Sequence, residues 1–274
     1  MDARLHRRVQ RYGWDAAADA YDRGWVPLLE RLTRSCVDRA ALQPGDRVLD
    51  LATGTGVGAF HAAAKVGPAG TVTGMDISER MVACAAAHRR ARRIESPPIG
   101  FERRDMEDTG AADDSFTAVV AAFGLMYAAD RAAALDEIRR VLAPGGRVSL
   151  VVWGRRGACG WAEVFPIVDA HVQSEVCPLF FALGTPGALP FALDRAGFTD
   201  VREERVSVTL GWASADEACA AMLEGSAVAL AWKRFSPAVR EAVREAYLAS
   251  IEPHRDGSTY LVPSEVLFAT GRKA

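Results

Sequence analysis

The stretch Val48-Leu-Asp-Leu-Ala-Thr-Gly-Thr-Gly-Val-Gly58 decides the fold of this 274-residue chain. Its apolar start predicts a buried strand that carries one acid, Asp50. The glycines at 54, 56 and 58 predict a tight turn into a helix, whose first free N–H groups face a ligand. A second apolar run ends at Asp76, where a carboxylate is placed to accept hydrogen bonds from ribose hydroxyls. Together these parts predict a site for a nucleoside-containing cofactor.

Two cofactors fit this turn, and Asp50 discriminates between them. Read as Gly54-x-Gly56-x-x-Ala59, the turn also matches the dinucleotide fingerprint, with Asp76 near the usual offset. An extra carboxylate beside the turn repels a diphosphate, because like charges interact strongly in a low-dielectric site. The same carboxylate favours a cofactor that carries an ammonium and a sulfonium. The sequence therefore favours S-adenosylmethionine, with a nicotinamide-dependent oxidoreductase as an alternative.

Five sequence blocks resemble, in the same chain order, the motifs of the class I S-adenosylmethionine-dependent methyltransferases. The blocks are Asp50–Gly58, Thr73–Met81, Phe101–Asp108, Phe116–Met126 and Leu142–Trp153. Within that class the chain is most similar to the ubiquinone/menaquinone-biosynthesis type and its small-molecule relatives, over about residues 12–154. The resemblance implies transfer of a methyl group from S-adenosylmethionine to an O, C or N nucleophile of a small molecule. The composition is compatible with a role in secondary metabolism.

Strand and helix patterns alternate from residue 47 to residue 153, which predicts an α/β fold with helices on both faces of a mainly parallel sheet. The resemblance implies a Rossmann-like, doubly wound sheet of seven strands whose final two strands form an antiparallel hairpin. Strands are expected at 47–51, 71–75, 99–103, 116–123, 146–153, 201–210 and 266–270. Helices are expected at 14–42 with a break at Pro27, from about 57, and at 78–90, 130–142, 186–197, 214–232 and 236–250.

The domain organisation follows from these elements. Residues 1–43 are expected to form an N-terminal helical lid, and residues 44–274 the methyltransferase domain. Additions near 155–185 and 212–257 are expected to cap the substrate side of that domain.

Bulk properties argue against several classes of partner. The net charge is −2, with 33 basic and 35 acidic residues, so no general phosphate-backbone binder is expected. Five scattered cysteines without a C-x-x-C pair argue against disulfides and a metal site. No apolar run reaches the ~20 residues that span a bilayer. A cytoplasmic monomer or homodimer is expected, without nucleic-acid or membrane partners. A methyltransferase that acts on nucleic acid or protein is the second alternative.

The resemblance assigns roles to twelve cofactor-binding residues. Four positions around the glycine turn are expected to line the methionine portion: Asp50, Ala52, Gly54 and Gly56. Asp76 is expected to bind both ribose hydroxyls. Ile77 and Met81 are expected to pack on adenine, Asp105 and the backbone of Met106 to hydrogen-bond to it, and the Phe123 carbonyl to bind the methionyl ammonium. Tyr21 and Trp25 are expected in the lid, where an aromatic face can attract the sulfonium.

A general base is needed for phenol and carbon-acid acceptors but not for a carboxylate. The candidates are His171, in the aromatic-rich addition, and His254, near the C-terminal loop. Tyr127, Trp153 and Trp161 are candidates for the wall of an aromatic acceptor pocket.

Overall fold

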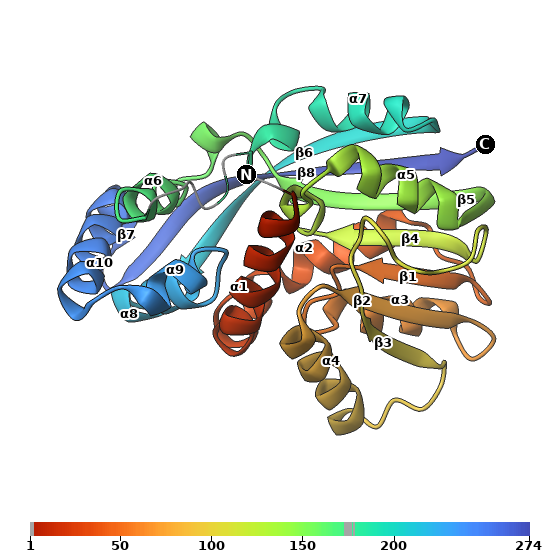
Figure 1. Ribbon diagram of the computed structural model, residues 1–274, viewed down its shortest axis with the longest axis horizontal. Coiled ribbons are helices and arrows are strands. Elements are labelled where there is room, and N and C mark those ends of the chain that lie inside the picture. The colour runs from red at the N-terminus through yellow and green to blue at the C-terminus, as the bar shows by residue number, and fades with distance from the viewer. Residues whose placement is uncertain (1–2, 173–176, 178) are drawn as a thin grey trace.

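A computed structural model describes residues 3–172, 177 and 179–274. Its centre is a mixed sheet in the order β3-β2-β1-β4-β5-β8-β6, with a short strand, β7, added beside β8 (Figure 1). The strands are β1 (Arg47–Leu51), β2 (Thr71–Asp76), β3 (Ile99–Arg103), β4 (Phe116–Ala122), β5 (Leu142–Trp153), β6 (Phe198–Trp212), β7 (Arg255–Asp256) and β8 (Thr259–Lys273).

The first five strands are parallel, and β8 runs antiparallel to both β5 and β6. The expected mostly parallel sheet with an antiparallel last strand is therefore confirmed. The prediction of a closing hairpin needs a correction, because β6 and β8 pair but are separated in the chain by a helical segment. The two-residue β7 brings the described sheet to eight strands.

Alternate residues of the buried strands belong to two hydrophobic clusters, one on each face of the sheet. Val48 and Ala118 belong to a cluster with α3 (Val57–Val66), whereas their neighbours Leu49 and Val119 belong to a cluster with α5 (Arg131–Val141). Such strands read as continuous apolar runs because both of their faces are covered.

Two helices that follow strands begin at a residue whose side chain caps the helix. The Ser78 hydroxyl accepts a hydrogen bond from the Met81 N–H at the start of α4 (Glu79–Ala91). The Asp130 carboxylate accepts from two N–H groups at the start of α5. Each cap satisfies N–H groups that the helix leaves free.

The N-terminal helices differ from the expectation in their length. The break before Pro27 is confirmed, and it separates α1 (Ala3–Gly24) from α2 (Val26–Arg39). The helix begins at residue 3 instead of 14. The additional turns carry Arg7 and Gln10, whose side chains hydrogen-bond to Glu107 and Cys177. Tertiary contacts therefore extend this helix beyond its apolar pattern.

The strands β6 and β8 are each 15 residues long and run beyond the rest of the sheet (Figure 1). A helical cap lies along their extended ends. It comprises α6 (Val164–Asp169), α8 (Ala215–Cys219), a π-turn η4 (Ala220–Glu224), α9 (Ala229–Arg234) and α10 (Pro237–Ile251). The predicted helix 214–232 is therefore wrong as one element. Part of the expected addition 155–185, residues 173–176 and 178, lies outside the described residues.

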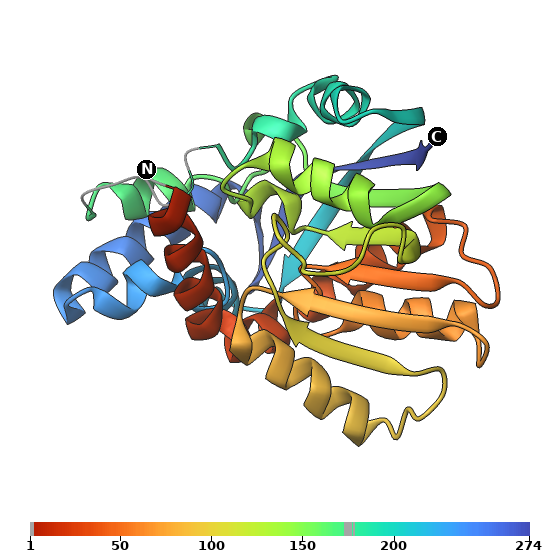
Figure 2. The same ribbon diagram turned by 45° about the vertical axis from the view of Figure 1, so that its right-hand side comes forward.

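Helix α1 crosses from the sheet to the cap, as Figure 2 shows. It packs against α4 on one side and against α9 and η4 on the other. The remaining helix beside the sheet, α7 (Ala188–Arg195), packs on β6 and ends before Gly197, as expected. No helix in the described part of the chain is long and apolar enough to cross a membrane.

One buried group in the cap gives a test of stability. Tyr247 on α10 is fully buried, and its hydroxyl has no hydrogen-bond partner among the described residues. We expect Tyr247→Phe to raise the free energy of unfolding by about 1 kcal/mol, because a buried hydroxyl without a partner costs roughly that much or more. Urea denaturation followed by circular dichroism measures this change.

The matched control is Tyr260→Phe, since Tyr260 is also buried but its hydroxyl lies 3.4 Å from Glu252. That variant is expected to gain nothing. A loss of stability in Tyr247→Phe would show that its hydroxyl has a partner in solution.

Candidate active site

A large cavity lies at the carboxyl ends of β1, β2 and β4, and residues of α1 and of the cap form its other walls. The volume of the cavity is about 1060 Å³, which includes space at its mouth that is open to solvent. Ten of the twelve residues predicted to bind the cofactor line it. They are Tyr21, Trp25, Ala52, Gly54, Asp76, Ile77, Met81, Asp105, Met106 and Phe123. Ligands of open α/β sheets bind at this end of the strands.

Asp50 does not line this cavity, because its side chain is turned toward the first turn of α3. The Thr53 hydroxyl donates to it over 2.7 Å, and the Ala59 N–H also acts on it. A Cβ on Gly58 would lie 2.8 Å from a carboxylate oxygen of Asp50, so only glycine fits there. Asp50 instead lines a smaller cavity of about 350 Å³. This cavity shares Tyr21 and Ala52 with the large one.

Gly56 lines neither cavity but shapes the turn. Its φ of 95° is in the left-handed region, and a Cβ there would lie 2.8 Å from the ring of Phe60. A side chain at this position is therefore excluded twice, by the backbone conformation and by the space. Gly54, which lines the cavity, likewise carries no side chain, so the backbone of the turn comes close to the cavity at that position.

Asp76 forms the wall opposite the glycine turn. One of its carboxylate oxygens accepts from the Gly54 N–H and the other from the Ser78 N–H, each over 2.9 Å. The acid therefore connects the end of β2 to the turn after β1 and to the start of α4. Its exposed fraction is 8%, so it keeps a narrow contact with the cavity.

Both acids are buried, and no positively charged side chain of the described residues pairs with either of them. Burial raises the pKa of Asp50 to about 7, against the opposing effect of the Thr53 hydroxyl and the Ala59 N–H. Burial also raises the pKa of Asp76 to about 6, against the Ser78 and Gly54 N–H groups. Desolvation disfavours the charged form of a carboxyl group, and a nearby cation reverses this effect. The two acids are therefore arranged to gain from a cationic ligand.

The floor of the cavity is held in unusual backbone conformations. Ala52 and Phe123 have φ values of 53° and 58°, in the left-handed region that side chains rarely adopt. They follow β1 and β4, which pair side by side. A Cβ on Gly124 would lie 2.3 Å from the Cβ of Ala52, so the two turns meet closely. Strained residues of this kind concentrate at functional sites.

A network at the cavity mouth was missed by the sequence reasoning. Arg7 of α1 donates to Glu107 and lies 3.1 Å from the Asp105 carboxylate. Glu107 also accepts from the Ala129 and Asp130 N–H groups at the start of α5. The network holds α1 across the loop that carries the predicted adenine-binding residues. The sequence contains part of the signal for this network. Arg7, Gln10, Trp14 and Tyr21, which all line the cavity, have the spacing that places residues along one face of a helix.

Comparison with known proteins identifies the family. Residues 48–146 match a family model described as a methyltransferase domain. Nocamycin O-methyltransferase of Saccharothrix syringae is 31% identical over 275 aligned positions, which cover 94% of this chain and 96% of that protein. The chain belongs to the class I S-adenosylmethionine-dependent methyltransferases.

Other members match a smaller part of the chain. The ubiquinone/menaquinone biosynthesis C-methyltransferase UbiE of Geotalea daltonii is 36% identical over 47% of this chain and 52% of its own length. Among solved structures, the (4+2)-cyclase SpnF is 26% identical, with a TM-score of 0.60 over 89% of this chain and 80% of that chain. A putative methyltransferase from Bacillus halodurans, 19% identical, has the same fold, with a TM-score of 0.61 over 88% of this chain and 98% of its own.

The residues of this methyltransferase fit S-adenosylmethionine better than a dinucleotide. In a dinucleotide site the diphosphate binds the free N–H groups at the start of the helix after the glycine turn. Here the Asp50 carboxylate lies against that first turn and engages the Ala59 N–H. A diphosphate would therefore meet a buried carboxylate, whereas an ammonium or sulfonium would be attracted by it. S-adenosylmethionine, when bound, supplies a methyl group activated by its positively charged sulfur.

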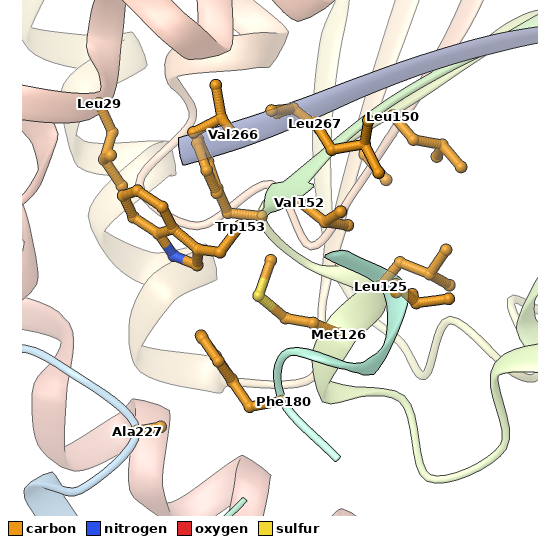
Figure 3. Packing of buried hydrophobic residues seen from close by; sticks show 14 of the residues in the cluster. Leu29, Leu125, Met126, Leu150, Val152, Trp153, Phe180, Ala227, Val266 and Leu267 are labelled. Atoms are coloured by element: carbon orange, nitrogen blue, oxygen red, sulfur yellow. The ribbon is translucent and has the colours of Figure 1, made fainter. Parts of the chain in front are cut away.

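The far end of the methyltransferase cavity is apolar and aromatic. Figure 3 shows the packing of buried residues in this region, where Trp153, Phe180 and Ala227 of the cavity lining come from separate segments of the chain. The lining there includes Tyr127, Trp153, Trp161, Phe165, Phe180, Met222, Ser226 and Ala227. Rings of Phe165, Phe180 and Trp161 contact one another at centroid distances of 4.8 to 6.2 Å. A lining of this kind is typical of sites for small molecules.

Neither histidine predicted as a base reaches this chamber. His171 is exposed and its ring packs against Phe235, and His254 lies over Gly160. All five histidines belong to the described residues, and none lines the cavity. The two base assignments therefore lack the geometric contact that proton transfer requires. No group of described residues has the composition of a metal site.

The buried acids predict how stability depends on pH. Because the pKa of Asp50 is raised to about 7 in the folded protein, its ionisation opposes folding, and stability is lost as the pH rises toward 7 and slightly above. We expect ligand-free Asp50→Asn to be more stable than the parent protein near pH 8, by on the order of a few kcal/mol. Below about pH 4 this advantage is expected to vanish. Thermal unfolding across this pH range measures the difference.

The matched control is Asp256→Asn, in which the replaced acid is exposed. This variant is expected to follow the pH dependence of the parent protein. A stability that falls with pH as steeply in Asp50→Asn as in the parent would contradict the role given to burial.

The histidine assignments can be tested separately. We expect His171→Ala and His254→Ala to change the affinity for S-adenosylhomocysteine by less than roughly twofold, since neither side chain contacts the cavity. Isothermal titration calorimetry measures both affinities. A tenfold loss in either variant would require that histidine to reach the cofactor in solution.

Proposed function

We propose that this methyltransferase transfers a methyl group from S-adenosylmethionine to an oxygen atom of an apolar small molecule, in secondary metabolism. The observation that carries the proposal is one continuous cavity with two unlike ends. One end has the buried acid Asp76 and the glycine turn, and the other end is walled by aromatic rings. An enclosed aromatic chamber fits a small acceptor better than a nucleic acid or a protein.

The extent of the alignments supports oxygen as the accepting atom. The match to nocamycin O-methyltransferase covers 94% of this chain, so it necessarily includes most of the cap over the acceptor chamber. The match to the C-methyltransferase UbiE of Geotalea daltonii covers 47% and leaves more than half of the chain unmatched. Acceptor choice depends on the cap, and the relative that shares the cap region is named as an O-methyltransferase.

We assign the cofactor roles to the residues that the cavity brings together. In this proposal Asp76 binds the ribose hydroxyls, and Ile77, Met81, Asp105 and Met106 surround the adenine. The carbonyl of Phe123 binds the methionyl ammonium at the end of β4. The lid comprises residues 1–43, within which Tyr21 and Trp25 close the cavity. Asp50 acts from behind the glycine turn through its charge.

The cellular compartment and the oligomeric state of the protein remain predictions. All five cysteines lie among the described residues and are unpaired, which favours a reducing compartment such as the cytoplasm. A monomer or a homodimer is expected, because a single chain provides both ends of the cavity.

Equilibrium binding tests the assignment of the cofactor. We expect micromolar binding of S-adenosylhomocysteine, much weaker binding of NADH, and a loss of affinity of at least about tenfold in Asp76→Ala, which removes hydrogen bonds to a charged group. Asp200→Ala is the control, because Asp200 is largely exposed and far from the cavity. Tight NADH binding without S-adenosylhomocysteine binding would overturn the proposal, and unchanged affinity in Asp76→Ala would overturn the ribose assignment.

A further inference from the structure

The acceptor chamber holds several hydrogen-bond donors without partners. Trp14, Tyr21, Tyr127 and Trp153 line the cavity, and no hydrogen bond joins their hydroxyl or indole N–H groups to a described residue. Trp153 is 4% exposed, so its N–H has little access to solvent other than the cavity. These donor atoms are not among the buried polar atoms that lack a partner, so they are open to the cavity, where a ligand atom can accept from them.

The other polar side chains along this wall are already engaged. Ser226 donates to the Met222 carbonyl over 2.6 Å, and Gln10 donates to the Cys177 sulfur over 3.7 Å. The Trp25 and Trp161 indoles donate to the Ala221 carbonyl and the Ser264 hydroxyl, respectively. The uncharged donors that remain for a ligand are therefore concentrated around Trp14, Tyr21, Tyr127 and Trp153. The charged donors of the lining, Arg7 and Arg104, pair with Glu107 and Glu102.

These donors surround one region of the cavity. The Trp14 ring contacts the Tyr21 ring at 5.7 Å and the Tyr127 ring at 5.0 Å, edge to face. The Trp153 ring lies 4.9 Å from the ring of Phe123, whose backbone follows β4 beside the predicted methionyl site. Tyr127 stands four residues further along the same turn. The donors therefore lie between the cofactor end and the aromatic chamber, where the accepting atom must approach the methyl group.

We propose that Tyr127 and Trp153 position the nucleophilic oxygen of an acceptor that enters the chamber as an anion, either a carboxylate or an acidic enolate. The inference rests on the proposed O-methyl transfer and specifies its substrate class. Indole N–H groups can only donate hydrogen bonds, and an anionic oxygen accepts several. The sulfonium of the methyl donor adds an attraction for the same charge.

The hydroxyl groups of Tyr127 and Tyr21 are suited to donate hydrogen bonds to the acceptor and not to act as general bases. Burial raises the pKa of Tyr127 and of Tyr21 well above their usual value, so both hydroxyls stay protonated near neutral pH. Burial likewise raises the pKa of Cys177 to about 12. The acids Asp105 and Glu107 face Arg7 at the mouth, and Asp76 is bound to the turn beside the cofactor end. The groups that meet the acceptor therefore orient an oxygen instead of removing its proton.

The transfer then needs no base. A lone pair of the acceptor oxygen forms the new bond to the methyl carbon, and the carbon–sulfur bond breaks with its electron pair going to sulfur. The oxygen loses its negative charge, the sulfonium becomes a neutral thioether, and no proton moves. Alignment of the acceptor oxygen with the methyl carbon supplies the main acceleration for such a displacement.

A pair of probes of the same shape tests this inference on protein loaded with S-adenosylhomocysteine. At about pH 7.5 we expect 2-naphthoate to bind at least about tenfold more tightly than the neutral 2-naphthamide, because hydrogen bonds to a charged oxygen are the stronger ones. We expect Tyr127→Phe to lower the affinity for 2-naphthoate by about tenfold while the affinities for 2-naphthamide and S-adenosylhomocysteine stay unchanged. Calorimetry or quenching of tryptophan fluorescence measures all three.

The matched control is Tyr12→Phe, which makes the same change on an exposed side chain of α1 that does not line the cavity. It is expected to bind both probes as the parent does. Equal binding of the two probes, an equal loss of both in Tyr127→Phe, or no binding of 2-naphthoate would overturn the inference. A protein that does not bind S-adenosylhomocysteine would instead overturn the proposed function.

A second measurement on the parent protein is independent of how the variant folds. Sinefungin carries an ammonium near the position of the sulfonium methyl, whereas S-adenosylhomocysteine is neutral there. We expect 2-naphthoate to bind several-fold more tightly to the sinefungin complex, and 2-naphthamide to bind both complexes equally. No preference of 2-naphthoate for the sinefungin complex would contradict an anionic acceptor.

Discussion

The site depends on two buried carboxylates in adjacent strands, Asp50 near the end of β1 and Asp76 as the last residue of β2. Each is held by neutral donors of the turns around it, and burial raises the pKa of both. The glycine turn owes its shape to these contacts, since Asp50 fits only against Gly58 and Asp76 accepts from the Gly54 N–H. Ionisation of these two acids therefore destabilises the folded protein, and a bound cationic nucleoside offsets that loss of stability.

A second constraint joins the lid, the sheet and the cap around Trp25. Its indole donates to the Ala221 carbonyl of η4 over 2.8 Å, and its ring lies 6.0 Å from the rings of Trp153, Trp161 and Trp212. Gly24 allows the close approach, because a Cβ there would lie 3.0 Å from the Cβ of Ala221. The residues that cover the cofactor and those that surround the acceptor therefore pack as one unit. The π-turn η4 places Met222 in the cavity wall, and π-turns frequently occur at functional sites.

The chemistry divides along the same cavity. Acids and backbone N–H groups stand at the cofactor end, whereas aromatic rings and unpartnered donors stand at the acceptor end. Methyl transfer from a sulfonium needs alignment and exclusion of water more than it needs acid or base groups. The position of His171 and His254 outside the cavity agrees with this division. The family membership gives the reaction class, and the lining of the acceptor end carries the information about the substrate.

Local sequence determined the strands and helices between residues 47 and 153, because glycine turns, N-caps and apolar runs act over a few residues. The stretch from Val48 to Gly58 and the acid at 76 were enough to predict the position of the cofactor end. Tertiary structure alone decided that Asp50 faces the first turn of α3, that α1 extends to Ala3 through Arg7 and Gln10, and that both candidate histidines stay outside. It also decided the order of β8 between β5 and β6 and the splitting of the helix at 214–232. Contacts such as Arg7 with Glu107 and Gln10 with Cys177 join residues 100 and 167 positions apart, and no short pattern in the chain encodes such contacts.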